Sequence, residues 1–221
     1  MKMRSLCLTL GALAVFWAPG HGADVLPWFQ TFLWQEHFLW DALMTARDRV
    51  ARQTADPHLL PVVRAIAQQT AQQSANLQQI QFYAKAQQDN LRFAFNQTDP
   101  TPSLATIRSN LETLQKGVSQ IRHNLYYLTA RTRMASSQAL PDPELMKTAT
   151  LLINQIQASQ MQLNSLYADA VAVQSQLATE TWLRDKPLRY QADLLVRATA
   201  NTQDAIFSIY NSSYELYLRS K

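Results

Sequence analysis

The chain has 221 residues, of which 47% are apolar and 16% charged, and its formal net charge is +4. This is enough apolar material for a sizeable core and too little charge for a disordered protein. Three of its four glycines lie in the first 22 residues, so only Gly117 serves the rest. β-Sandwiches, barrels, doubly wound folds and phosphate-binding loops need more glycines than this. The composition, rich in Gln and Ala, therefore predicts an all-α protein.

The first 22 residues have the layout of a secretory signal peptide. Lys2 and Arg4 precede an apolar run at 6–17, and small residues follow at Gly20 and Gly22. We expect cleavage after Gly22. The alternative is an uncleaved membrane anchor, but the run is shorter than the roughly 20 residues that span a bilayer.

Cleavage would change both the charge and the chemistry of the chain. Removing Lys2 and Arg4 leaves 18 basic against 16 acidic residues, or +2, and removes Cys7, the only cysteine. No basic cluster remains to indicate nucleic-acid binding, and disulfides or thiolate sites are excluded. We therefore expect an exported bacterial protein of the periplasm or cell envelope, including the cell surface, held together by packing alone.

Residues 23–221 are predicted to form a single helical-bundle domain, whose first helix, at about 27–54, is strongly aromatic. On a helix its apolar side chains form two stripes rather than one. Such a helix is either buried at the centre of the bundle, or it contacts lipid or a partner protein. The candidate contact residues are Trp28, Phe29, Phe32, Leu33, Trp34 and Trp40.

Prolines and capping residues divide the remainder into helices at about 57–96, 103–137, 143–182 and 187–218. Ser103 is the expected N-cap of the second of these, and Asp142 that of the third. Apolar residues recur at alternating spacings of three and four in 103–137 and 143–182, which is typical of a coiled-coil seam. In 103–137 this seam consists of Leu104, Ile107, Leu111, Leu114, Val118, Ile121, Leu125 and Leu128; in 143–182 it consists of Leu145, Ala149, Leu152, Ile156, Ser159, Leu163, Leu166, Ala170, Val173 and Leu177.

These patterns predict an elongated antiparallel bundle with coiled-coil-like heptad packing. The seam of 57–96 includes Thr70, Gln73 and Gln87, which indicates an interrupted core. Short loops between long helices favour antiparallel neighbours. We expect helices 103–137 and 143–182 to pair as one antiparallel hairpin, with Leu125 and Leu152 both buried.

The last helix carries a second group of aromatic residues. Phe207, Tyr210, Tyr214 and Tyr217 follow one another at helical spacing, and the three tyrosines share a side. One reading is that they pack at the edge of the bundle with their hydroxyls in water. The other is that they form a docking surface for a partner.

No set of residues has a spacing suited to chemistry. The histidines expected to remain after cleavage, His37, His58 and His123, do not pair with a further ligand at i+3 or i+4, and the Glu-x-x-His repeats of di-iron bundles are missing. The carboxylates are scattered singly over separate segments. The sequence therefore predicts a protein that is not an enzyme and binds no metal or cofactor.

Two Gln-rich stretches resemble a known family. Residues 65–73, with the sequence AIAQQTAQQ, and the stretch from Leu152 to Leu177 look like the helices of the minor pilin of type IV secretion and conjugation systems. The signal peptide, the length and the lack of cysteine are similar too. A Gly-containing motif that follows the first long helices in that family is not reproduced by the single Gly117.

The resemblance implies a non-enzymatic, oligomeric role at the tip or base of a pilus. We therefore expect a structural component of an envelope-spanning machine, whose partners are other protein subunits or further copies of the chain. Two alternatives stay open. One is a free periplasmic binding or chaperone-like protein. The other is a membrane-acting bundle that inserts its aromatic first helix into lipid.

Overall fold

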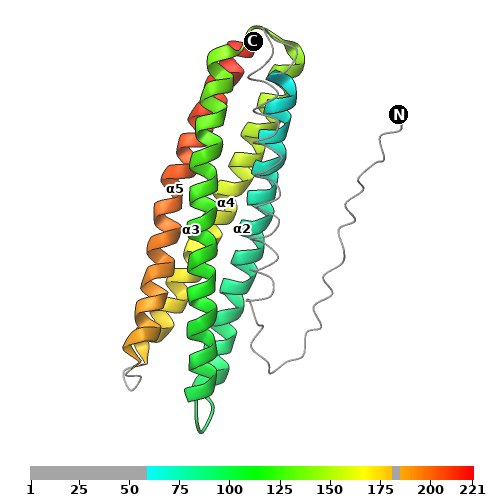
Figure 1. Ribbon diagram of the computed structural model, residues 1–221. Coiled ribbons are helices and arrows are strands. Elements are labelled where there is room, and N and C mark those ends of the chain that lie inside the picture. The colour runs from blue at the N-terminus through cyan, green and yellow to red at the C-terminus, as the bar shows by residue number, and fades with distance from the viewer. Residues whose placement is uncertain (1–58, 181–184) are drawn as a thin grey trace, which may run out of the picture.

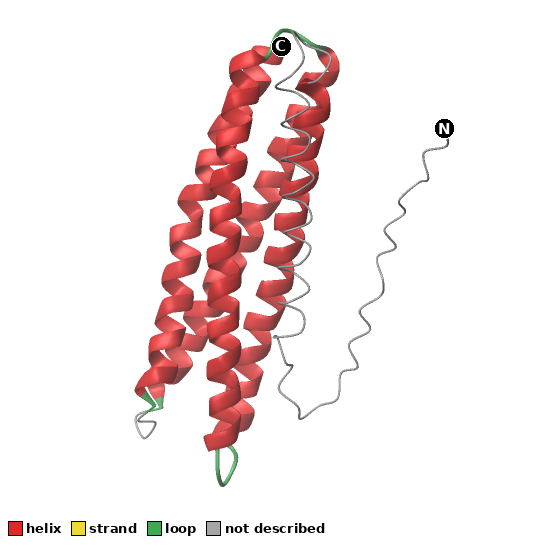
Figure 2. Ribbon diagram, viewed as in Figure 1, coloured by secondary structure: helices red, strands yellow, loops and turns green. Residues whose placement is uncertain are grey.

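The computed structural model describes residues 59–180 and 185–221, which form a long bundle of four helices (Figures 1 and 2). The helices are α2 (Leu59–Phe95), α3 (Thr101–Gln138), α4 (Pro143–Thr179) and α5 (Lys186–Ser220). The all-α, elongated architecture is thus confirmed. Each helix has 35 to 38 residues and extends about 55 Å at about 1.5 Å per residue. The helix predicted at 27–54 lies outside the described residues.

Side-chain caps determine where α4 and α5 begin. Asp142 Oδ1 accepts hydrogen bonds from the backbone N–H groups of Glu144 and Leu145, at 2.8 and 3.1 Å. Asp185 Oδ1 accepts one from the N–H of Leu188 at 2.9 Å. In each helix a proline occupies the first turn, where its missing N–H leaves no donor unsatisfied. The cap predicted at Asp142 is therefore confirmed.

The start of α3 differs from the prediction. The helix begins at Thr101, two residues before Ser103, and its N-cap position is Pro100, which makes no side-chain cap. Asp99 Oδ1 accepts from the Thr101 N–H at 3.1 Å instead. Ser103 lies inside the first turn, where its hydroxyl donates to Gln97 Oε1 at 2.8 Å.

Hydrogen bonds between α2 and α4 show that these two helices are parallel neighbours. Ser74 Oγ donates to Gln162 Oε1 at 2.8 Å, and Gln81 Nε2 donates to Asp169 Oδ2 at 2.8 Å. Both pairs are 88 residues apart, a constant separation that only parallel helices give. Helices α3 and α5 also pack side by side in the same direction (Figure 1).

Consecutive helices run in opposite directions, but α3 and α4 are not neighbours. Among the four described helices, α2 contacts α3 and α4, and α5 contacts the same two. No backbone contact joins α3 to α4, which lie diagonally across the bundle axis. The prediction that these two helices form a packed hairpin is therefore wrong.

The connection between α3 and α4 explains this arrangement. Ala139 and Asp142, at its two ends, have extended backbones with ψ of 134° and 118°. Four extended residues reach about 13–14 Å, close to the diagonal of a bundle whose neighbouring axes are about 8–10 Å apart. On the way the Asp142 N–H donates to the Ser220 carbonyl at 3.0 Å, so the connection passes the end of α5.

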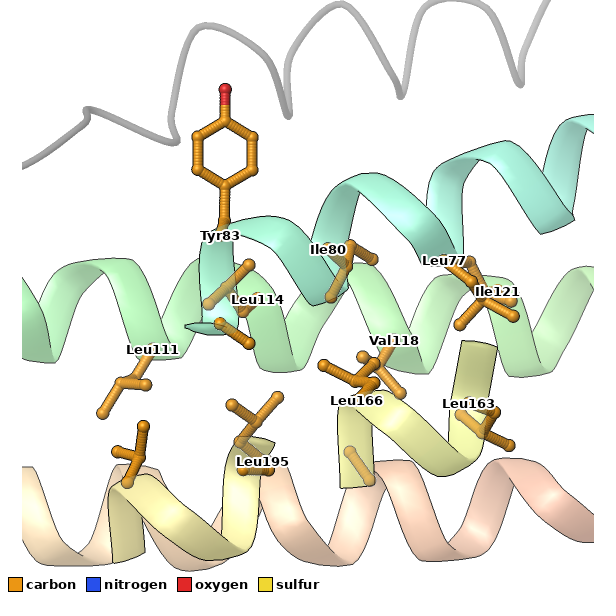
Figure 3. Close-up of a cluster of buried hydrophobic side chains, with 14 of the residues drawn as sticks. Leu77, Ile80, Tyr83, Leu111, Leu114, Val118, Ile121, Leu163, Leu166 and Leu195 are labelled. Carbon is orange, nitrogen blue, oxygen red and sulfur yellow. The ribbon is translucent and has the colours of Figure 1, made fainter. Parts of the chain in front are cut away.

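The seam residues predicted from the sequence form the core. Every seam position identified in the predicted 103–137 and 143–182 helices is buried, including Leu125 (1% exposed) and Leu152 (0%). Figure 3 shows Leu77, Ile80, Leu114, Val118 and Leu166 gathered between the helices. Because the chain after Cys7 has no cysteine, this packing must supply the stability of the described bundle.

Buried amides interrupt the core between α2 and α3. Asn110 Nδ2 donates to Gln87 Oε1 at 3.2 Å, and Asn124 Nδ2 donates to Gln73 Oε1 at 3.4 Å. All four residues are at most 4% exposed. A misregistered pairing of α2 with α3 would leave these amides without partners in an apolar interior, so they favour one register. The interrupted core that was predicted for residues 57–96 is thus found in α2.

Adjacent leucines on α4 test the seam assignment. Leu152 is fully buried, whereas Leu151 is 51% exposed. We predict that Leu152→Ala lowers the free energy of unfolding by about 2–5 kcal/mol, because it leaves a cavity. Leu151→Ala should change it by less than about 0.5 kcal/mol. Urea denaturation of both variants is the measurement, and equal losses would contradict the assignment.

The amide pair Gln87–Asn110 should behave as a coupled unit. Gln87→Ala removes the acceptor of the buried Asn110 amide, and Asn110→Ala leaves Gln87 Oε1 with only the Asn90 amide, at 3.4 Å. Each change should cost about 1–3 kcal/mol of unfolding free energy. In a double-mutant cycle the second change should cost less than the first, with a coupling of at least about 0.5 kcal/mol. Strictly additive losses in urea melts would show that the hydrogen bond does not form.

Candidate contact surface

The contact residues predicted in the first helix lie outside the described part of the chain. This applies to Trp28, Phe29, Phe32, Leu33, Trp34 and Trp40. His37 and His58 lie outside it too, and His123 is exposed on α3. These residues therefore stay predicted contacts, and the surface described below belongs to helices α2 to α5.

Two of the four grooves between neighbouring helices are lined by charges. Along the α2–α4 groove, Arg64 pairs with Glu144 at 3.6 Å, and Asp169 accepts from the amides of Gln81 and Gln88. The α3–α5 groove is richer still in ionic side chains. The buried seam of α5 consists of Leu188, Ala192, Leu195, Thr199, Thr202, Ile206, Ile209, Ser213, Leu216 and Ser220. With the seam residues of each helix as heptad positions a and d, the charged side chains along the α3–α5 groove are Arg108, Glu112, Arg122, Arg133, Glu215 and Arg219.

The α4–α5 groove differs, because a long stretch of it carries no charge. Gln203 Nε2 donates to Asn164 Oδ1 across this groove at 3.4 Å. Gln174 donates to Asp193 nearer the end of the bundle at which α4 ends and α5 begins. These pairs fix the antiparallel register of the two helices. The b and e positions of this stretch, which we call the α4–α5 face, are Met146, Thr150, Ile153, Gln157, Gln160, Asn164, Tyr167 and Val171 on α4, and Val196, Ala200, Gln203, Phe207, Tyr210, Tyr214 and Tyr217 on α5.

Stacked tyrosines form one edge of the α4–α5 face. The rings of Tyr210 and Tyr214 lie 6.4 Å apart and almost parallel, at 3°, and those of Tyr214 and Tyr217 lie 6.2 Å apart at 26°. The spacings i+4 and i+3 place the three rings on one side of α5. Phe207 precedes them and is 65% exposed. The four residues present a large aromatic area at a small cost in side-chain entropy.

The α2–α3 groove provides an informative contrast. It too is lined mainly by amides and small residues, with Arg131 as the one cation at its c and g positions in the described helices. There, however, Gln69, Asn76, Tyr83 and Asn110 are all buried. Burial raises the pKa of the Tyr83 hydroxyl, although a hydrogen bond with Gln79 acts to lower it. A groove with a single cation is thus buried on one side of this bundle, whereas the α4–α5 face is largely exposed.

The α4–α5 face is suited to binding rather than to proton transfer. Its side chains offer hydroxyls, amides, aromatic rings and aliphatic groups, and they include no carboxylate, histidine, lysine or arginine. Within residues 59–180 and 185–221, no three His, Cys, Asp or Glu side chains gather where they could hold a metal ion. Nor does any of the four described helices have the length and apolarity to cross a membrane.

Comparison with known proteins adds no relative to this picture. No family model, no curated protein and no solved structure matches the chain.

Sequence reasoning found half of this surface. The spacing of Tyr210, Tyr214 and Tyr217 predicted their common side, which the stacking confirms. The α4 half was missed because α4 was expected to pair with α3. The signal that could have revealed it is the lack of charge at the b and e positions of α4 from 146 to 171 and of α5 from 196 to 217, which is visible once the seams are assigned.

Adjacent residues on α5 test whether the face is surface or core. Ile206 is 2% exposed and Phe207 is 65% exposed. We predict that, in solution dilute enough to keep the chain monomeric, Phe207→Ala changes the free energy of unfolding by less than about 0.5 kcal/mol. Ile206→Ala should lower it by about 2–5 kcal/mol. The measurement is chemical denaturation monitored by circular dichroism. A large loss of unfolding free energy with Phe207→Ala would show that this ring stabilises the fold.

Proposed function

We propose that this protein is an exported, non-enzymatic structural component of an envelope-spanning machine, and that the machine is a type IV secretion or conjugation system. The observation that carries the proposal is the α4–α5 face. Soluble proteins seldom leave a long uncharged, aromatic surface in contact with water unless it binds something. Tyrosine-rich, charge-poor surfaces are typical of protein interfaces.

The shape of the bundle supports a scaffolding role. A rod about 55 Å long offers contact along its length and at both ends. Its interior is filled by leucine, isoleucine and valine side chains such as Leu111, Leu163 and Ile209. The Gln-rich stretches that resemble the minor pilin lie on α2 and α4, and those helices have buried seams in the bundle.

The choice of machine depends on the resemblance together with the predicted signal peptide. The aromatic segment from Trp28 to Trp40 provides a second contact in this proposal, beside the inner membrane or the pilus shaft. The membrane-acting alternative is favoured by the same segment, because Trp and Phe are enriched at membrane interfaces. The free chaperone-like alternative would use the α4–α5 face to hold clients.

Affinity purification from solubilised envelope fractions, followed by mass spectrometry, tests the proposal. Co-purification of secretion ATPases and pilus subunits would support it. Capture of diverse unfolded exported proteins would indicate the chaperone-like alternative. Leakage of dye from liposomes on addition of the protein alone would indicate the membrane-acting one.

The aromatic first segment should matter for assembly more than for folding. We predict that replacing Trp28 and Trp34 together with Ala abolishes co-purification with envelope partners, or flotation with liposomes. Anchors of this kind commonly contribute more than about 2 kcal/mol each to binding. The melting temperature measured by circular dichroism should fall only modestly. A variant that unfolds, or one that keeps both fold and association, would contradict this role.

A further inference from the structure

We propose that the α4–α5 face binds the same face of a second copy of this chain, which gives a two-fold symmetric dimer. This inference rests on the proposed function only in taking the face as a contact surface. It adds the identity of the partner, the symmetry of the contact and the register in which the two copies meet.

The chemistry of the face is complementary to itself. Tyrosine hydroxyls and the amides of Gln157, Gln160 and Gln203 each donate and accept hydrogen bonds, so a copy of the face can satisfy them. A two-fold contact brings the same patch together twice, which repels any patch with a net charge. The α3–α5 groove, with its several arginines, would meet this repulsion, and the α4–α5 face does not.

A partner of opposite character would fit the face poorly. Charged side chains placed against it would lose water without gaining a counter-ion. The apolar members of the face instead require apolar cover, and Phe207 at 65% and Tyr214 at 46% exposure remain largely in water in the single chain. A second copy supplies both the apolar cover and the neutral hydrogen-bonding groups.

The area of the face agrees with the needs of a stable dimer. Two neighbouring helices present a strip about 20 Å wide, and some 22–26 residues at about 1.5 Å each make it roughly 35 Å long. The resulting footprint of about 700 Å² on each copy is close to the roughly 800 Å² per partner of a standard interface.

The register follows from the bonds across the groove. Gln203 contacts Asn164, and α4 and α5 are antiparallel. Two heptads further toward the end of α5, Tyr217 therefore lies level with Thr150, and Tyr214 lies level with Ile153. A two-fold axis parallel to the helices places α5 of one copy against α4 of the other at the same level. The stacked tyrosines then cover the segment around Ile153 of the second copy, and neighbouring helices across the interface are antiparallel.

Sedimentation equilibrium of the purified full-length chain, with matched variants, tests the dimer. The test variant is Phe207→Glu with Tyr214→Glu, which brings four carboxylates into the interface. The control is Phe82→Glu with Tyr126→Glu, because Phe82 (63%) matches Phe207 (65%) and Tyr126 matches Tyr214 (both 46%) in exposure. We expect the wild type and the control to dimerise. The test variant should self-associate at least about a hundredfold more weakly than the wild type.

Disulfide trapping gives a second readout that does not depend on the Glu variants folding. With Cys7 changed to Ser, any introduced cysteine can form a disulfide only between chains. Gln203→Cys places a thiol in the α4–α5 groove near the proposed axis, and Asn201→Cys places one on the same helix toward α3. Mild oxidation should convert the Gln203→Cys protein to a covalent dimer well before the Asn201→Cys protein.

A wild type that stays monomeric at every concentration would overturn the dimer, as would a dimer that only the control variant dissociates. The failure of the dimer can be told from that of the proposed function by capture from envelope fractions. If a monomeric wild type captures secretion subunits and the Phe207→Glu, Tyr214→Glu variant does not, the face serves another protein. If neither captures them, the proposed function fails as well.

Discussion

The buried a and d positions of the described helices are the constraint on which the rest of this structure depends. Four helices of 35 to 38 residues meet along apolar seams, and the core has no disulfide to support it. Because a and d must point inward, the b, c, e and g positions are left to the grooves and the surface. The composition of those positions then decides what each groove can bind. In this chain two grooves carry charge, and the α4–α5 groove carries a long neutral, aromatic stretch.

The inward side of each described helix was predictable, and the neighbours of each helix were not. A strict 3.5-residue period shows which residues are buried, and Leu125 and Leu152 lie in the core as expected. The same period fits any adjacent helix equally well, so it does not distinguish α3 from α5 as a partner for α4. That choice depends on the extended connection at 139–142 and on cross-groove pairs such as Ser74 with Gln162. Neither the course of this connection nor the cross-groove pairs can be predicted from the hydrophobic periodicity.

The candidate surface was predictable to a similar extent. The spacing of the α5 tyrosines predicts that they share one side of the helix. A surface formed by two helices can be predicted only if α4 is known to lie beside α5. The polar seam positions behave likewise. Gln87 was recognised as an irregular seam residue, whereas its partner Asn110 lies at a g position that no pattern singles out. The aromatic residues from Trp28 to Trp40 keep the status of a prediction, since they fall outside the described residues.

We expect the α4–α5 face to be covered by protein in the cell envelope. Hydroxyl-radical footprinting of the protein in intact cell envelopes and in dilute solution tests this most directly. Tyr214 and Tyr126 are equally exposed at 46%, so they should be oxidised to similar extents in the dilute protein. In the envelope, we expect strong protection of Tyr214 and Phe207 and little change at Tyr126. Equal oxidation of Tyr214 in both settings would contradict it.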